Sequence, residues 1–281
     1  MRRHALDLVD RAAALLAPPP RSSPVVCLGF HAVDAVPSDI SLHPNRFAAL
    51  MRRLRDDGFH GVSVREWESG ASVPGRPIIL TFDDGFRSVR SEALPVMAEY
   101  GFHATVFPIT AGIAKRADWR TARGPFPPME MLSEADLREL VRAGWEVGSH
   151  GVRHVFLPAL GRPELETEAR ASREALEDIV GERVSTFAYP YGAFSADAVR
   201  AVREAGYRTA WTTRPGRLDT TRPLLLSRHV VPPRATVTTL RAMFGRGLAT
   251  VYSVAGGIDR LRGRRPRYSA YDERTDCSTF V

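Results

Sequence analysis

The sequence predicts an α/β fold in which seven or eight parallel strands close into a distorted barrel. Short apolar runs alternate with longer segments of helical period, which is the pattern of strands joined by crossover helices. Some runs, such as residues 78–80 and 224–226, are continuously apolar and indicate strands buried on both faces. An open doubly wound sheet would share these two features. The barrel is favoured because unusual polar residues stand just beyond several separate runs, and the ends of barrel strands converge on one mouth.

The expected helices are marked by periodicity and by capping residues. Apolar residues recur at helical spacing over residues 47–54, and Gly58 is placed to end that helix. Ser133 begins another helix, with Asp136 three residues later in the capping-box position. The expected strands are residues 25–30, 61–64, 78–82, 104–109, 145–148, 185–189, 207–212 and 224–231.

Length and composition describe one large folded unit with a segment at each end. With 281 residues, 44% hydrophobic and 25% charged, the chain is long enough to bury a sizeable core, so disordered and fibrous classes are excluded. Residues 1–24 predict a short helix followed by a proline-rich linker. Residues 25–232 are the expected barrel, and residues 233–281 are the expected C-terminal helical extension and tail.

The formal net charge of +7 does not indicate a nucleic-acid partner. Lys115 is the only lysine, so arginine supplies nearly all the positive charge, and no basic motif interleaved with aromatic residues is present. Cys27 and Cys277 are far apart and predict neither a disulfide framework nor a metal-binding pair. The sequence shows no signal peptide and no membrane span. We therefore expect a protein of the cytoplasm or the membrane periphery, with peripheral membrane contact left open and the oligomeric state unknown.

Two adjacent carboxylates give the sharpest chemical signal. Asp83 and Asp84 stand at the end of an apolar strand, directly before Gly85. If both were buried, their repulsion would protonate one of them unless a cation or hydrogen bonds held the pair ionised. Gly85 lets the backbone turn, so both carboxylates can address the mouth. An ordinary Asp-Gly turn is the alternative interpretation of this motif alone.

Two histidines follow another strand. His150 and His154 are four residues apart, a spacing at which two imidazoles can face the same way on a helical turn and bind a divalent transition metal. A pair of this kind is a weak signal alone, because histidine is also common in caps and on surfaces. With a carboxylate from another strand end, it makes the two-histidine, one-carboxylate set of a catalytic metal site with a position left for water.

A third polar segment, residues 187–192, runs from an apolar strand into an aromatic-proline-glycine corner. Such a corner fixes the directions of backbone N–H groups. Fixed N–H groups beside a metal can stabilise an oxyanion, although the segment would also serve simply as a turn that closes a strand.

Together and in this order, the three segments resemble the motifs of the polysaccharide deacetylases, also called carbohydrate esterase family 4. The resemblance covers about residues 25–231. It implies a distorted (β/α) barrel that removes N-acetyl or O-acetyl groups from sugars with a divalent metal, zinc first, with nickel or cobalt as alternatives.

The resemblance also implies a role for each motif residue. Asp83 would be the general base and Asp84 a metal ligand. His150 and His154 would be the other two ligands, and the backbone N–H of Tyr191 would contribute to an oxyanion hole. The roles are chemically coherent, since a carboxylate that does not ligate the metal is placed to take a proton from water.

Two histidines are candidates for the general acid. His31, at the end of the first strand, stands in a segment that resembles an element of the circularly permuted branch of the family. That branch includes exopolysaccharide and poly-N-acetylglucosamine deacetylases. His31 is therefore the expected acid, and His229, on the last strand, is the alternative.

The sequence departs from the family pattern at two motif positions and lacks a clear aspartate-rich fourth motif. Ala188 stands where an arginine is usual, which leaves the orientation of Asp83 without its usual cation. Arg228, at the end of the last strand, is a candidate for that missing cation. Gly151 replaces the usual serine or threonine between the two histidines.

These features predict a metal-dependent hydrolase that removes acetyl groups from an N-acetylated sugar, polysaccharide or glycan precursor. Two alternatives remain. One is a catalytically impaired barrel that binds glycan. The other is a deformylase or amidase that acts on a lipid-linked amino sugar.

Overall fold

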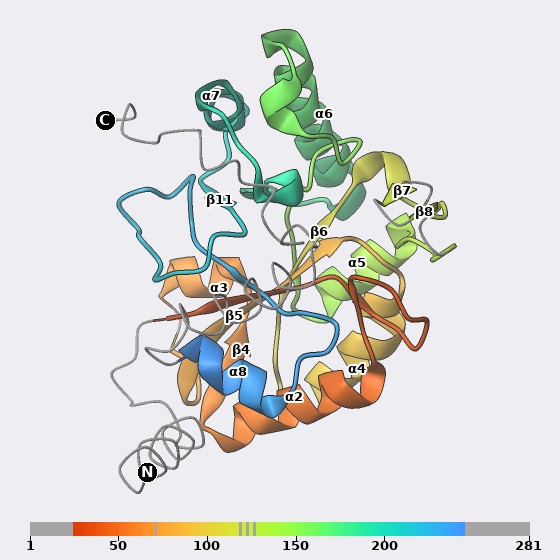
Figure 1. Cartoon of the computed structure of the whole chain (residues 1–281). Coiled ribbons are helices and arrows are strands. Elements are labelled where there is room, and N and C mark those ends of the chain that lie inside the picture. The colour runs from red at the N-terminus through yellow and green to blue at the C-terminus, as the bar shows by residue number, and fades with distance from the viewer. Residues whose placement is uncertain (1–24, 71, 118–119, 122–123, 126–127, 245–281) are drawn as a thin grey trace, which may run out of the picture.

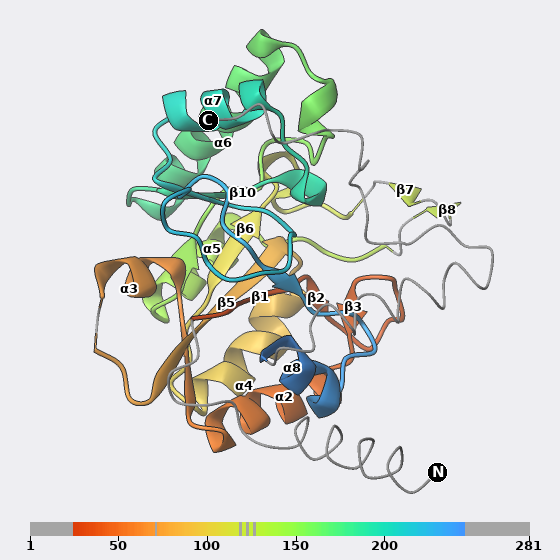
Figure 2. The same cartoon turned by 60° about the vertical axis from the view of Figure 1, so that its left-hand side comes forward.

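A parallel β-sheet runs through the centre of the molecule (Figures 1 and 2). The structure is a computed structural model, and it describes residues 25–70, 72–117, 120–121, 124–125 and 128–244. The path of the main sheet, in spatial order, is β12 (His229–Val230), β1 (Cys27–Phe30), β5 (Arg76–Asp84), β6 (Thr105–Pro108) and β9 (Glu146–Val147).

The sheet closes into a ring through β10 (Thr186–Ala188) and β11 (Thr209–Trp211), which pair in parallel. A parallel bridge between Ser149 and Phe187 joins the segment after β9 to β10. A second bridge, between Trp211 and Leu226, joins β11 to the segment that leads into β12. Since β12 pairs with β1, seven parallel strand segments complete the circuit within the described residues. The predicted distorted barrel is confirmed.

One expected strand, residues 61–64, is offset from the strand that the structure shows. β4 (Phe59–Val62) pairs only with the first half of β5 and lies off the path of the sheet. α3 (Val64–Ser69) begins immediately afterwards, because Ser63 and Glu66 form a capping box. The prediction ran past the end of the strand because this helix start was overlooked.

The larger helices lie outside the ring in two groups, and both expected helices are present. Helix α2 buries the apolar side chains whose spacing predicted it, and α5 begins with the predicted Ser133–Asp136 capping box. The helices are α2 (Pro44–Asp56), α4 (Leu94–Ala98), α5 (Glu134–Arg142), α6 (Arg162–Val180), α7 (Ala196–Glu204) and α8 (Val237–Phe244). Figures 1 and 2 show α2, α4 and α8 together on one side of the sheet and α6 and α7 on the other.

Short elements connect these strands and helices. No helix in the described part of the chain is both long enough and apolar enough to cross a membrane. The short elements are β2 (Ala32–Val33) paired with β3 (Ser41–Leu42), β7 (Arg120–Thr121) paired with β8 (Gly124–Pro125), a π-helical turn at Val89–Ala93, and 3-10 turns at Thr110–Gly112, Leu157–Ala159 and Pro190–Gly192.

The alternation of side chains along β5 decides which of them enter the barrel. Leu80 and Phe82 belong to the apolar layer between the barrel and the helices. Ile79 belongs to a separate apolar cluster drawn from β1, β5, β6, β10 and β11, which fills the interior. Thr81 and Asp83 follow Ile79 on the interior face, and both are buried.

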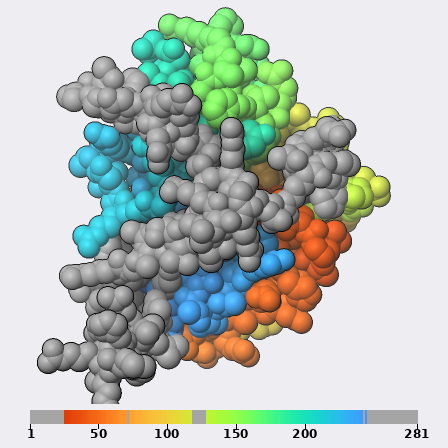
Figure 3. Space-filling model, in the orientation of Figure 1, coloured from red at the N-terminus to blue at the C-terminus, as the bar shows by residue number. Residues whose placement is uncertain are grey.

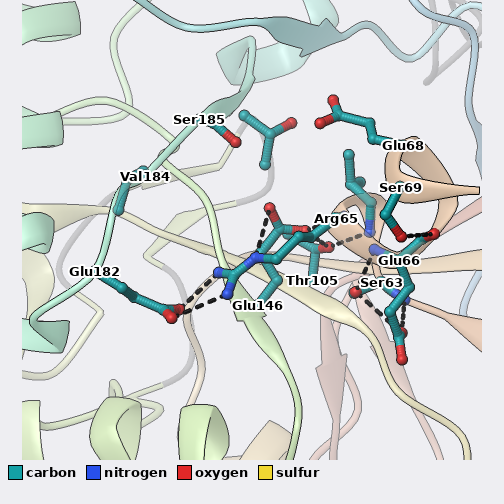
Figure 4. A network of polar contacts seen from close by, with 12 residues as sticks. Ser63, Arg65, Glu66, Glu68, Ser69, Thr105, Glu146, Glu182, Val184 and Ser185 are labelled. Carbon is teal, nitrogen blue, oxygen red and sulfur yellow. Dashed lines mark hydrogen bonds and ion pairs between the residues drawn. The ribbon is translucent and has the colours of Figure 1, made fainter. Parts of the chain in front are cut away.

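Helix α3 covers the end of the barrel at which the strands begin (Figure 4). The N–H of Arg65 donates to Glu146, the first residue of β9, at 2.8 Å. The hydroxyl of Thr209, the first residue of β11, donates to Glu68 at 2.8 Å. Because this end is filled, the opposite end is the mouth, and the polar residues noted in the sequence lie there.

Helix α8 packs against α2, and Figure 3 shows its blue surface beside the orange surface of α2. The ring of Phe244 stacks on that of Phe59 with 4.8 Å between centroids, and Arg46 donates to the carbonyl of Arg234 at 3.5 Å. The start of the C-terminal extension thus contacts the barrel, and the division into three segments stays a prediction. The expected N-terminal helix and linker (1–24) and the extension beyond residue 244 lie outside the described residues.

Candidate metal centre

The end of β5 turns Asp84 away from the direction that alternation alone would give it. Asp84 has a φ of 68° and Gly85 a φ of 84°, so two consecutive residues are left-handed. A Cβ at position 85 would lie 2.8 Å from the Cβ of Pro108, and only glycine fits there. The turn brings the carboxylate of Asp84 across the mouth, where Oδ1 meets two histidines.

His150 is oriented by the strand next to it. Its Nδ1 lies 2.7 Å from the carbonyl oxygen of Ala188, the last residue of β10. That acceptor fixes the tautomer, with the proton on Nδ1 and the lone pair on Nε2. Nε2 lies 3.5 Å from Oδ1 of Asp84.

His154 reaches the same oxygen from a loop. Its Nε2 lies 3.4 Å from Oδ1 of Asp84, and its ring centroid lies 5.0 Å from that of His150. The helical turn expected between the two histidines is wrong, because the φ of Gly151 is 80° and that of His154 is 53°. Left-handed residues at both positions bend the loop so that two imidazoles four residues apart converge without a helix.

The three side chains fit a divalent transition metal. Oδ1 of Asp84 is buried and accepts no hydrogen bond from the residues that the structure describes. This oxygen and one nitrogen of each imidazole lie within 4.8 Å of one another. Tetrahedral coordination with bonds of about 2.0–2.1 Å would place ligand atoms about 3.3 Å apart, close to the two spacings at Oδ1.

The burial of Asp84, His150 and His154 changes their pKa values in a way that favours binding of a cation. It lowers the pKa of His150 to about 4 and that of His154 to about 4, so both imidazoles are neutral at pH 7 and neither forms an ion pair with Asp84. Burial also raises the pKa of Asp84, with the negative charge of Asp83 acting in the same direction. Three buried groups that resist carrying charge alone are suited to share a positive ion.

Asp83 faces the barrel interior and meets Arg228. Nη1 and Nη2 of Arg228 donate to the two carboxylate oxygens at 2.6 and 2.8 Å, and Nε donates to the carbonyl of Thr212 at 3.2 Å. Burial would raise the pKa of Asp83, but the guanidinium of Arg228 holds it well below its usual range. Arg228, which the sequence suggested as the replacement for the arginine missing at position 188, is therefore in contact with Asp83.

The two candidate acids, His31 and His229, have different surroundings in the structure. His31 follows β1, and its charge is the strongest influence that opposes the effect of burial on the pKa of Asp84. His229 lies within β12 and is buried. Burial lowers the pKa of His229, and a hydrogen bond with the backbone of Gly216 opposes that shift.

Tyr191 lies at the rim of the same site. Its φ is 61°, inside the 3-10 turn that follows β10. Its ring centroid is 4.4 Å from that of His154 and 6.5 Å from that of Phe156. Tyr191 and Phe156 are 48% and 44% exposed, which leaves an open aromatic surface next to the proposed ligands.

Three of the proposed site residues share a left-handed backbone conformation that was not predicted from the sequence. Four residues other than glycine have a positive φ in the described part of the chain, and three of them are Asp84, His154 and Tyr191; Ala114 is the fourth. Such conformations cost free energy and gather where function requires them. The available signal was the glycine that directly follows Asp84 and Tyr191.

Comparisons with known proteins agree with this geometry. The polysaccharide deacetylase family model matches residues 70–210. The Bacillus subtilis (strain 168) protein YxkH, itself assigned to the polysaccharide deacetylases, is 24% identical over 211 residues, covering 74% of this chain and 70% of its own. A poly-β-1,6-N-acetyl-D-glucosamine N-deacetylase of Staphylococcus aureus is 22% identical over 180 residues, covering 60% of this chain and 59% of its own.

Solved structures share the fold. IcaB from Ammonifex degensii superposes with a TM-score of 0.67 at 25% identity, covering 79% of this chain and 97% of its own. The Streptococcus pyogenes deacetylase PplD, solved with acetate, superposes with a TM-score of 0.67 at 20% identity, covering 81% of this chain and 99% of its own. The family model spans half of the chain and includes Asp83, Asp84 and both histidines. The chain therefore belongs to the polysaccharide deacetylase family.

Proposed function

We propose that this protein is a metal-dependent hydrolase that removes N-acetyl groups from an amino-sugar glycan. The observation that carries the proposal is the convergence of Asp84, His150 and His154 around one buried point, with Asp83 held ionised next to them. Zinc suits this donor set, and nickel or cobalt would also suit it.

In this proposal the two neighbouring aspartates have different roles, Asp84 as a metal ligand and Asp83 as the general base. When bound by Asp84, His150 and His154, a divalent ion polarises the acetyl carbonyl and makes water more acidic. Asp83 takes the proton of the attacking water, and Arg228 holds that carboxylate in place.

The remaining groups act on the products of that attack. The backbone N–H of Tyr191 donates to the oxyanion in this proposal, because the turn that carries this residue lies beside His154. His31 gives a proton to the sugar nitrogen as the carbon–nitrogen bond breaks, which releases acetate and a free amine.

The substrate class rests on two kinds of support. The Staphylococcus aureus relative is named for poly-N-acetyl-glucosamine, which is a polymer of N-acetylated sugars. The exposed rings of Tyr191 and Phe156 offer an apolar surface on which the face of a sugar ring can pack, next to the proposed ligands. An N-acetylated oligosaccharide or polymer is therefore the proposed substrate.

The test is the hydrolysis of N-acetylglucosamine oligomers, followed by the release of acetate. We expect turnover that a chelator abolishes and that added zinc or cobalt restores, and we expect Asp84→Asn to remove it. Turnover that survives chelation would contradict the mechanism. Release of formate from a formylated amino sugar, without acetate from any oligomer, would instead support the deformylase alternative.

The alternative of an impaired glycan binder rests on two departures from the family pattern, Ala188 and the missing fourth motif. The first of these removes the usual cation beside Asp83. Arg228, which directly precedes β12, donates two hydrogen bonds to the carboxylate of Asp83, so the site does not lack a cation.

A further inference from the structure

The loop between the two proposed histidine ligands is held by hydrogen bonds on both sides. On one side, the N–H groups of Thr110 and Ala111 donate to the carbonyls of Gly151 and Val152 at 3.2 and 2.9 Å. On the other side, the loop donates to a single side chain, Glu168 of α6.

Glu168 accepts three hydrogen bonds from this loop. Its Oε2 accepts from the N–H of Val152 at 2.7 Å and from the N–H of Arg153 at 3.1 Å. Its Oε1 accepts from Nε of Arg153 at 2.7 Å. The carboxylate thus binds two successive peptide N–H groups midway between His150 and His154.

The burial of Glu168 shows that this contact is not a surface ion pair. The residue is 1% exposed, on the face of α6 that otherwise buries residues such as Leu165, Ala169 and Leu176. Burying a carboxylate is costly unless hydrogen bonds replace its hydration. A carboxylate buried on this face, with three of its hydrogen bonds coming from the loop, therefore indicates a specific role toward the loop.

We propose that Glu168 is a positioning residue that sets the two histidines for metal binding. By fixing the peptides of Val152 and Arg153, it fixes the path of the loop and so the direction of the His154 imidazole relative to His150. The inference rests on the proposed function, because it takes these histidines as ligands.

The same contact gives a reason for the departure from the family pattern at position 151. A Cβ on Gly151 would lie 3.1 Å from Oε2 of Glu168, and the φ of 80° already disfavours any other residue. A serine or threonine there would press on the carboxylate that holds the loop. Glycine at 151 and glutamate at 168 thus form a matched pair in this chain.

The test compares Glu168→Gln with a matched control, Glu146→Gln. Both residues are buried glutamates that accept a backbone N–H, but Glu146 lies at the opposite end of the barrel (Figure 4). Affinity for zinc is measured by competition with a chromophoric chelator, and the ligand geometry is followed by the visible absorption of bound cobalt. We expect E168Q to weaken zinc binding by about 10–100-fold and to change the cobalt spectrum, and E146Q to alter neither.

A second measurement does not depend on how the variants fold. In the metal-free wild-type protein, the amides of Val152 and Arg153 should exchange slowly with deuterium, because Glu168 holds them before metal binds. Rapid exchange of both amides would overturn the inference. So would E168Q that binds zinc as tightly as the wild type. If the wild-type chain binds neither zinc nor cobalt, the proposed function itself fails, and the inference fails with it.

Discussion

Asp83 and Asp84 are adjacent but have opposite surroundings, because Asp84 adopts a left-handed backbone conformation and Asp83 does not. Alternation along β5 sends Asp83 into the barrel, where it meets Arg228, whereas the left-handed φ of Asp84 turns its carboxylate toward the histidines. One carboxylate is paired with a guanidinium and kept ionised, and the other is left for a cation. In the proposed mechanism, this separation lets two neighbours of the same residue type serve as base and ligand.

Replacing Arg228 tests the role of Asp83 as a base. In Arg228→Gln, burial is no longer offset, so the pKa of Asp83 rises from its present depressed value. The ionised form is needed, so the acid limb of the kcat/KM profile should move to higher pH, with a loss of about 100-fold near neutral pH. Arg228→Lys keeps the charge without the two-pronged geometry and should lose less. A pH profile unchanged in both variants would remove Arg228 from the site.

Phe156 provides a test of the sugar-binding surface. In Phe156→Leu the ring is lost while some apolar bulk remains, and an aromatic contact of this kind contributes about 0.5–1.5 kcal/mol. The ratio of kcat/KM for the tetramer to kcat/KM for the monomer should fall about 2–10-fold. Val36, which is 47% exposed, provides the control. Val36→Ala should not change the ratio, and an equal fall in both variants would count against the surface.

The sequence was sufficient to predict which side chains the structure brings together at the mouth, but not how the backbone turns them. Asp84, His150 and His154 were predicted as a set because their types and order are chemically restrictive. Arg228 was suggested because the motif left Asp83 without a cation, and the contact is present. The loop geometry at His154 was missed, because a spacing of four residues suits a helical turn as well as a left-handed loop.

At the scale of elements, the two ends of the barrel are built for different purposes. The strands begin at a network of polar side chains that α3 covers (Figure 4). The proposed base and ligands lie at the opposite end, in the last two residues of β5 and in the loop after β9. Strand positions were predictable from apolar runs, whereas the end of β4 at Val62 depends on the capping box of Ser63 and Glu66, which begins α3.

The network beneath α3 should make stability depend on pH. Burial raises the pKa of Glu146 from 4.5 to about 7, with hydrogen bonds from Arg65 and Thr105 opposing the shift. The folded protein therefore holds a proton that the unfolded chain releases near pH 4.5. This group's contribution to the free energy of unfolding should be lost between about pH 4.5 and 7, by about 3 kcal/mol.

Urea unfolding of the wild type and Glu146→Gln at several pH values isolates this contribution. The buried histidines titrate in both proteins and work in the other direction, because their lowered pKa values make stability rise with pH. The difference in the free energy of unfolding between the two proteins should therefore change with pH, even where the opposing contributions leave the wild-type curve flat. A constant difference from pH 4.5 to 7.5 would show that Glu146 keeps its ordinary pKa.

At the scale of the whole molecule, the proposed site joins segments that are distant along the chain. Asp84 is the last residue of β5, and both histidines follow β9, so a bound ion would tie two sectors of the ring together. Binding to the folded state alone stabilises it in proportion to the logarithm of ligand concentration over Kd.

Metal removal should thus lower the melting temperature. At a zinc concentration about 100 times Kd, the gain is about 2.7 kcal/mol, or about 5–10 °C for a chain of this size. Calorimetry with and without chelator measures the shift, and Asp84→Asn should show almost none. An equal zinc effect in the wild type and in Asp84→Asn would place the ion elsewhere.

The guanidinium beside Asp83 comes from the segment that enters β12, the last strand to join the ring. A nascent chain that has left the ribosome only as far as β11 would carry every proposed ligand, yet its buried base would have no counter-charge. In the proposed mechanism, such an intermediate would turn over acetylated sugars far more slowly than the whole chain. The full rate of hydrolysis would require synthesis past Arg228 and closure of the ring.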